Sequence, residues 1–504
     1  MLYNGASKKR MRRRFNPEPT FHTTPIEKIL LPLDSRDELP PILAGLQWIW
    51  THPTLKTAIL ALLEARLLAG KIATGRTGMD LWQILVLGVV RLGLDADWDR
   101  MEHLANYDLL LRQMLGLCPD PWGSNARRFG HQTLRDNVAL VDAALLKEIN
   151  VLVAAEGRQV FQSKPSAEPA PLQLKADSYV LETDVHFPTD LNLLFDAGRK
   201  CLDLVEKYQK IFGYDLPGWR KLEDWRRRFK AVERVASKAA FGGGKDKDQR
   251  VRAAVSDYLA VGRGLSAKVQ ASLLSLCDQP VDVRDWELLA YFQQMIDKHL
   301  DLVDRRLLQH QVIPTAEKVY SLFEPHTEWI TKGKLQPPVE LGHRLLVATD
   351  QHQLIQDYEG PVGADVDQSV PVASRLLARY GEGQIASMSF DKGFTRREDR
   401  ELLELFIPQV IMPKRGRRNA EESEAESAKK FVALRKAHSA VESAINALEH
   451  HGLNRCLDVG LEGYTRYIGY GVLAYNLHVI GRQLLAQRRG AEIAEAATKL
   501  ASMA

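Results

Sequence analysis

One strand-like segment, isolated among helical patterns, most constrains how this chain can fold. The apolar residues Leu172, Leu174 and Ala176 alternate with polar residues up to Val180, which is the period of a β-strand. The next strand pattern appears only at residues 344–349. Because a single strand leaves its backbone hydrogen bonds unmade, we expect it to pair with the later strands across a long helical insertion.

The last third of the chain supplies those partners. Strand-like and helical patterns alternate there, which is typical of an α/β layer. The fold class that we predict is α/β (α+β). The expected strands are residues 344–349, 385–389 and 409–412, and the expected helices are 372–380, 397–405 and 430–450.

Composition shifts and proline-rich stretches divide the chain into seven predicted segments. They are a basic N-terminal arm (1–24), a helical DNA-binding or dimerisation domain (25–156), a linker (157–171), the first part of the sheet domain (172–196), a helical insertion (197–336), the remainder of the sheet domain (337–488) and a C-terminal tail (489–504).

Overall composition excludes several classes of protein. The 68 Lys and Arg against 64 Asp and Glu give a net charge of +4, which excludes an acidic solvating protein and a histone-like basic one. The four cysteines are far apart, so a thiolate zinc ribbon is excluded and a reducing, cytoplasmic setting is favoured. No segment reaches the roughly 18 apolar residues of a membrane span, and we expect no membrane partner.

Positive charge is nevertheless clustered, at residues 8–14, 220–250 and 414–418. Each cluster can be a solvated surface or a contact to DNA phosphates. Trp219, Trp225 and Phe229 are interleaved with the second cluster, as in some nucleic-acid surfaces. The candidate DNA contacts from these clusters are Arg226, Arg227, Arg228, Lys414, Arg415, Arg417 and Arg418.

Acids in three separate places could converge at the sheet. Asp177 lies in the first strand, Asp391 follows the strand 385–389, and Glu442 borders the apolar stripe of the helix 430–450. Each alone is also explained by a turn or by a solvated helix surface. Together they could hold two Mg²⁺ ions about 4 Å apart for phosphodiester chemistry, and Mn²⁺ is expected to substitute.

Several motifs resemble those of bacterial insertion-sequence DDE transposases. Asp177-Ser178, followed by His186-Phe187-Pro188-Thr189-Asp190, resembles their first-strand motif, and Asp391-Lys392-Gly393-Phe394 resembles their second-Asp motif. Glu442 and the segment through 474–477 are similar to the Glu helix and the C-terminal segment, and residues 80–135 to the N-terminal domain. The resemblance implies a ribonuclease-H-like catalytic domain, interrupted by an all-helical insertion and preceded by an all-helical domain.

The resemblance also implies an activity and its residues. A DDE transposase cleaves DNA at the ends of its element and transfers the strands into target DNA. Asp177, Asp391 and Glu442 would be the catalytic metal ligands. Three rival acids remain open at this stage, namely Asp184 and Asp190 for the first position and Glu449 for the third.

The expected partners follow from the same resemblance. They are terminal-repeat and target DNA, bound by a homodimer or larger assembly in the bacterial cytoplasm at the nucleoid. Arg435 and His438 precede Glu442 where many relatives carry Tyr and Arg, and they are further candidate DNA contacts. Two alternatives stay open: a transposase-derived DNA-binding protein without catalysis, and a metal-dependent nuclease of the same fold.

Overall fold

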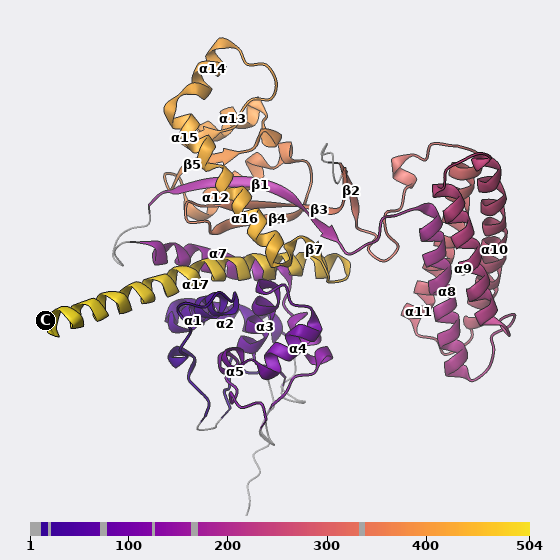
Figure 1. The fold of residues 1–504 in the computed structure, drawn as a ribbon, viewed down its shortest axis with the longest axis horizontal. Coiled ribbons are helices and arrows are strands. Elements are labelled where there is room, and N and C mark those ends of the chain that lie inside the picture. Colours follow the sequence, from indigo (N-terminus) through magenta and orange to yellow (C-terminus); the bar gives the residue numbers. More distant parts are fainter. Residues whose placement is uncertain are drawn as a thin grey trace, which may run out of the picture. The chain divides into compact units, whose positions relative to one another are not determined.

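The computed structural model describes residues 12–18, 22–70, 78–122, 127–162, 170–331 and 338–503. The chain divides into two compact units (Figure 1): one combines residues up to Asp184 with Gly342–Ala504, and the other is Val185–Leu341. The structure is mixed α/β and mainly helical, which confirms the predicted class at that level. Of the helices in the described ranges, none has the length and apolarity that a membrane crossing requires.

The first unit begins with a group of helices. Its central helix α3 is buried along its whole length, because apolar side chains occupy nearly every position. The elements in order are η1 (Ile26–Lys28), α1 (Leu39–Thr51), α2 (Pro53–Leu67), α3 (Leu81–Gly93), α4 (Trp98–Tyr107), α5 (Leu109–Met114), α6 (His131–Val138), α7 (Ala143–Gly157) and η2 (Arg158–Phe161).

A mixed sheet follows, whose strands within this unit have the order β4-β3-β1-β5-β6. The pairs β1/β3 and β3/β4 are antiparallel, whereas β1/β5 and β5/β6 are parallel. A short strand β7 runs parallel to the far end of β1. The bounds are β1 (Leu172–Thr183), β3 (Val339–Thr349), β4 (Ile355–Val362), β5 (Ile385–Phe390), β6 (Val410–Ile411) and β7 (Arg455–Cys456).

Strand β1 confirms the alternation that the sequence predicts, and it reaches further, to Thr183. Leu174 and Ala176 belong to one buried core with α12 and α13. Tyr179 and Leu181, of the opposite parity, belong to a second core with α16 and α17. Asp177 shares that second parity, so it lies on the sheet face toward α16.

The remaining helices of this unit cover the sheet. The predicted single helix 430–450 is wrong, because it is interrupted at His438, between α15 and α16. The elements are η5 (Asp365–Asp367), α12 (Ser369–Tyr380), η6 (Lys392–Phe394), α13 (Arg397–Glu404), α14 (Ala420–Ser427), α15 (Lys429–Ala437), α16 (Ser439–Leu448), η7 (Glu449–Leu453) and α17 (Gly460–Met503).

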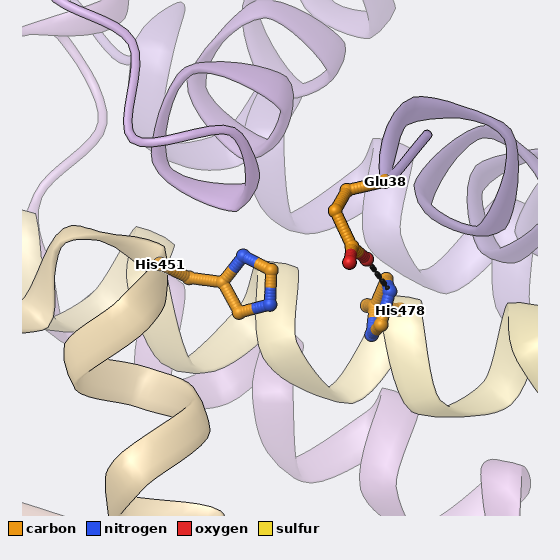
Figure 2. A group of neighbouring side chains, drawn as sticks. All are labelled: Glu38, His451 and His478. Atoms are coloured by element: carbon orange, nitrogen blue, oxygen red, sulfur yellow. Dashed lines mark ion pairs between the residues drawn. The ribbon is translucent and has the colours of Figure 1, made fainter. Parts of the chain in front are cut away.

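Helix α17 runs between the sheet and the N-terminal helices (Figure 1) and packs against α1, α3 and α7. Its His478 forms an ion pair with Glu38 at the start of α1 (Figure 2). One continuous core therefore includes the N-terminal helices, one face of the sheet, α16 and α17. The predicted tail 489–504 is instead a helical extension of α17, up to Met503.

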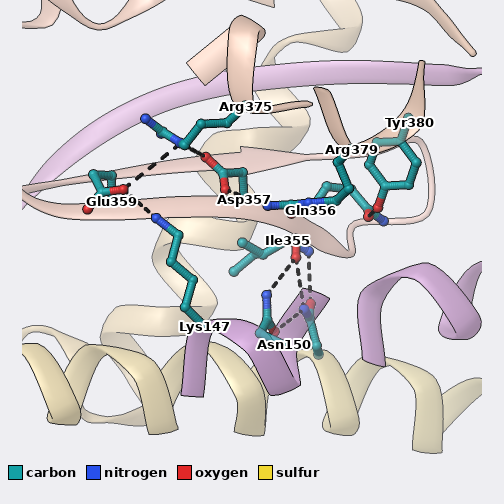
Figure 3. Close-up of polar contacts among 10 residues, drawn as sticks. Lys147, Asn150, Ile355, Gln356, Asp357, Glu359, Arg375, Arg379 and Tyr380 are labelled. Atoms are coloured by element: carbon teal, nitrogen blue, oxygen red, sulfur yellow. Dashed lines mark hydrogen bonds and ion pairs between the residues drawn. The ribbon is translucent and has the colours of Figure 1, made fainter. Parts of the chain in front are cut away.

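Strand β4 has no counterpart among the predicted strands, because polar residues interrupt its pattern. Asp357 is buried and pairs with Arg375 (2.7 Å) and Arg379 (3.1 Å) of α12. On the other side, Asn476 of α17 accepts the Ile355 N–H (2.8 Å) and donates to the Ile355 carbonyl (2.9 Å). These contacts (Figure 3) supply the partners that buried polar groups require.

The described part of the second unit is mainly helical and includes a short strand. Trp219 and Phe229 are 0% and 1% exposed in its core, which corrects their interpretation as part of a nucleic-acid surface. The unit also begins before the predicted insertion boundary at 197, since α8 begins at Asp190. Its elements are α8 (Asp190–Phe212), α9 (Leu222–Phe241), α10 (Lys247–Leu276), α11 (Val283–Val303), η3 (Asp304–Leu308), η4 (Thr315–Glu317) and β2 (Glu328–Thr331).

Candidate functional site

Asp177 and Asp391 lie side by side on neighbouring parallel strands. The register of β1 and β5 pairs Ala176 with Phe390, so Asp177 is the next residue of β1 and Asp391 directly follows the end of β5. Strand β5 ends there, so Asp391 turns into the solvent-exposed start of η6, whereas Asp177 stays half-buried within β1. This is the edge of the sheet where side chains can reach a ligand.

Glu442 approaches the same place from α16. Val441, Ala444 and Ile445 are buried against the core and hold this helix against β1. Glu442 lies beside that buried face, in the first turn of the helix, and is exposed. Its carboxylate is close enough to Asp177 to act on the pKa of that residue.

The pKa of Asp177 is raised to about 7. Burial is the largest cause, and the Ser178 N–H, which donates to Asp177 Oδ1 at 2.8 Å, opposes it. Repulsion from Asp391, Asp365 and Glu442 raises the pKa further. Burial and the three neighbouring acids therefore both favour the protonated form of the Asp177 carboxyl group.

Asp365 also belongs to this acidic group, although it is not among the site residues predicted from the sequence. Its Oδ1 accepts a hydrogen bond from the Ser178 hydroxyl at 2.5 Å. Its Oδ2 lies 3.1 Å from where a Cβ on Gly393 would be, in the turn after Asp391. The polar strand β4 precedes it, so no apolar alternation marked the segment, and the Asp-Val-Asp of η5 was the only signal.

The acids do not form a tight ligand cluster. Within the described part of the chain, the group of three or more His, Cys, Asp or Glu whose ligand atoms all lie within 4.8 Å of one another is Glu38, His451 and His478. Some oxygens of the acidic group are therefore further apart than this. A two-metal site distributes its ligands over ions about 4 Å apart, and oxygen donors alone suit Mg²⁺ or Mn²⁺.

The three rival acids lie elsewhere. Asp184 follows the end of β1 and is exposed, 3.8 Å from Arg455. Asp190 belongs to the second unit, where it is buried and paired with Arg306 at 2.8 Å. Glu449 lies in η7, after the end of α16, and contributes to the raised pKa of Tyr179. The structure thus brings Asp177, Asp391 and Glu442 together without the rivals.

His438, a candidate DNA contact, is partly buried. Its Nδ1 lies 3.0 Å from the Ser389 hydroxyl of β5, and burial lowers its pKa. Asp391 acts on the same ring in the opposite direction. The contact fixes the break between α15 and α16 against the sheet, and so positions the helix that carries Glu442.

Two of the four basic residues in the loop 414–418 pair with acids of α14. Lys414 pairs with Glu422 at 2.6 Å and Arg418 with Glu426 at 2.8 Å. Arg415 instead donates to the carbonyls of Lys392 (2.7 Å) and Gly393 (2.8 Å), directly after Asp391. Arg417 and Arg435 are exposed.

The other basic candidates differ in whether their charges are already paired with acids of the protein. Arg226 contacts the carboxylates of Asp203 (2.5 Å), Glu206 (2.8 Å) and Glu223 (3.4 Å), so its charge is compensated within the second unit. Arg227 pairs with Asp224 at 2.5 Å, and Arg228 is exposed. Of the basic arm, residues 8–11 lie outside the described residues, and Arg14 pairs with Glu64 at 2.6 Å.

Comparisons with known proteins do not identify this site. No protein-family model matches the chain, and no curated protein or solved structure matches it either.

The raised pKa of Asp177 predicts a gain in stability when its charge is removed. The folded pKa, about 7, lies above the unfolded value, so the folded state binds this proton more tightly and stability falls as pH rises from about 4 to about 7. We expect Asp177→Asn to be more stable than wild type at pH 8 in EDTA, by up to about 4 kcal/mol.

Urea unfolding at several pH values measures this effect. The difference between the two proteins should shrink as the pH falls toward 4, because wild-type Asp177 is then protonated in both states. Asp367→Asn is the control, since Asp367 is exposed and pairs only at the surface with Arg396. A less stable Asp177→Asn at pH 8 would contradict the raised pKa of Asp177.

Proposed function

We propose that this protein is a DNA transposase that cleaves the ends of its element and joins them to target DNA at a DDE site. One observation carries the proposal. Asp391 and Glu442, from two distant segments, come close to the half-buried carboxyl group of Asp177. The sequence motifs around two of these acids support it. The mixed sheet, with antiparallel strands followed by parallel ones and helices on both faces, is compatible with a ribonuclease-H-like catalytic domain.

The donor set fits Mg²⁺ or Mn²⁺. Asp177, Asp391 and Glu442 would hold the ions, and Asp365 adds a fourth carboxylate at the same edge. When bound, such ions would supply activation of the attacking water or 3′-hydroxyl and stabilisation of the leaving oxygen.

The protein's own groups then have distinct tasks. Asp391 and Glu442 are exposed, so a DNA backbone can approach them. Asp177 is half-buried and is oriented by the Ser178 N–H, while the Ser178 hydroxyl orients Asp365. Since strand cleavage and joining are both phosphodiester exchanges, this single site can serve both, and its main contribution is alignment.

DNA binding would rely on the exposed arginines. Arg417, Arg435 and Arg228 are exposed on the surface of their units and can contact phosphates. Holding two element ends at once requires a homodimer or larger assembly. We place that assembly at the nucleoid, in the cytoplasm.

The test is an incubation of the purified full-length protein with a plasmid that carries the DNA flanking its own coding region. Mg²⁺, Mn²⁺ and EDTA reactions are compared by mapping nicks and by sequencing joined products. We expect metal-dependent nicks at the element ends and joining of those 3′ ends to new sites. Nicks without joining would show a nuclease, and binding without nicks a DNA-binding protein; either result contradicts the proposal.

A further inference from the structure

We propose that Glu38, His451 and His478 form a second metal site, for a transition metal of the Zn²⁺ class. Their ligand atoms all lie within 4.8 Å of one another, inside the first unit (Figure 2). Glu38 directly precedes α1, His451 lies in η7, and His478 lies on α17. This inference does not depend on the transposase proposal, because it involves none of the four acids at the sheet edge.

The hydrogen bond of His451 prepares its other nitrogen for a metal. Nδ1 lies 2.8 Å from the carbonyl oxygen of Gly93. A carbonyl can only accept, so Nδ1 carries the proton and Nε2 presents a lone pair. A metal-binding histidine commonly donates its second N–H to a backbone carbonyl in this way, which fixes the tautomer and the orientation of the ring.

His478 brings the second imidazole to the cluster from α17. Its side chain is buried and contacts the Glu38 carboxylate directly (Figure 2). Two imidazole nitrogens and one carboxylate therefore meet at one place, and the carboxylate supplies negative charge that a dication needs.

The donor set distinguishes this site from the acidic one. Two imidazoles and one carboxylate are a frequent ligand set for Zn²⁺, whereas Mg²⁺ prefers oxygen donors alone. Zinc–nitrogen distances of about 2.0–2.1 Å place tetrahedral donors about 3.3 Å apart. A small rearrangement of the three side chains reaches that spacing, in which Glu38 and His478, now in direct contact, separate slightly. Three protein ligands also leave a fourth position open for water.

A cavity provides room for that fourth ligand. It measures about 570 Å³, and its lining includes all three residues together with Ser443 and Tyr475. Ser443 follows Glu442 on α16, whose end leads into the segment that carries His451. A metal here would tie the end of α16 to α1 and α17, three segments that are remote in sequence.

The experiment titrates the metal-free, full-length protein with Co²⁺ and then with Zn²⁺. We expect one high-affinity ion per chain, with the intense visible absorption of four-coordinate Co²⁺, no displacement by excess Mg²⁺, and a Zn²⁺-dependent rise in Tm. His451→Ala and Glu38→Gln should each weaken binding by at least about 100-fold, because even the loss of a supporting partner costs about 10- to 100-fold.

Two further variants make the result unambiguous. His450→Ala, at the exposed neighbour of His451, should bind Zn²⁺ as wild type does. Asp391→Asn should also leave this ion in place, which separates the site from the acids at the sheet edge. Glu38 is exposed, so Glu38→Gln keeps the test valid if a histidine variant unfolds. Weak six-coordinate Co²⁺ spectra, unchanged affinity in Glu38→Gln, or loss of the ion in Asp391→Asn would each overturn the proposal.

Discussion

Replacing Asp391 by Asn is expected to lower metal-dependent DNA cleavage by about 1,000-fold or more. The amide keeps the size of the side chain but removes the charge that, in the proposed site, would hold a cation beside Asp177. A bound metal ion contributes several kcal/mol of transition-state stabilisation, and about 4 kcal/mol corresponds to 1,000-fold in rate. Asp391 is exposed, so the fold should not depend on it.

Single-turnover cleavage of end-labelled DNA measures this effect, at a fixed Mg²⁺ concentration and with unfolding curves taken in parallel. Asp367→Asn is the matched control: it removes an exposed carboxylate from the neighbouring element η5, and its surface pair with Arg396 is worth little. Equal cleavage by wild type and Asp391→Asn would show that Asp391 does not belong to the proposed site. A comparable loss in Asp367→Asn would point to a general effect of charge.

Asp177 and Asp391 illustrate what local sequence pattern can predict. The alternation around Leu174 and Ala176 identified strand β1 and placed Asp177 on the opposite face. The apolar run before Asp391 identified β5 and its end. Both inferences depend only on the period of a strand, which a sequence displays directly.

Features that depend on distant partners were not predictable in this way. Strand β4 carries Asp357, whose burial is possible only because Arg375 and Arg379 reach it from α12. Asp365 follows that strand, so it was missed together with it. The interruption at His438 depends on Ser389 of β5, which no local pattern in residues 430–450 reveals.

The histidine and glutamate cluster shows the same limit more strongly. Glu38 and His478 are separated by most of the chain and meet only because α1 packs against α17. Neither residue lies in a spacing that is typical of a metal motif. The packing of these two helices is therefore a precondition for the proposed second site, and it can be tested on its own.

Gly481→Ala is expected to destabilise the protein by about 3 kcal/mol or more, because α1 and α17 touch backbone to backbone at this residue. A Cβ on Gly481 would lie 1.8 Å from the Pro41 carbonyl oxygen, and one on Gly45 would lie 2.3 Å from that of Leu477. Carbonyl groups of two helices cannot move aside as a flexible side chain can. The helices must separate, and overpacking of this kind costs about 1–3 kcal/mol or more.

Gly490→Ala, on the same helix, should have the opposite effect. Gly490 is exposed, and nothing lies within 4 Å of its would-be Cβ, so the change should stabilise the protein by about 0.5–1 kcal/mol through helix propensity. Urea unfolding of both variants measures the two changes in stability. The Zn²⁺ affinity of Gly481→Ala should fall together with its stability, since Glu38 and His478 would move apart. If both variants shift the midpoint in the same direction, the close approach of α1 and α17 is wrong, and with it the geometry that unites Glu38 and His478.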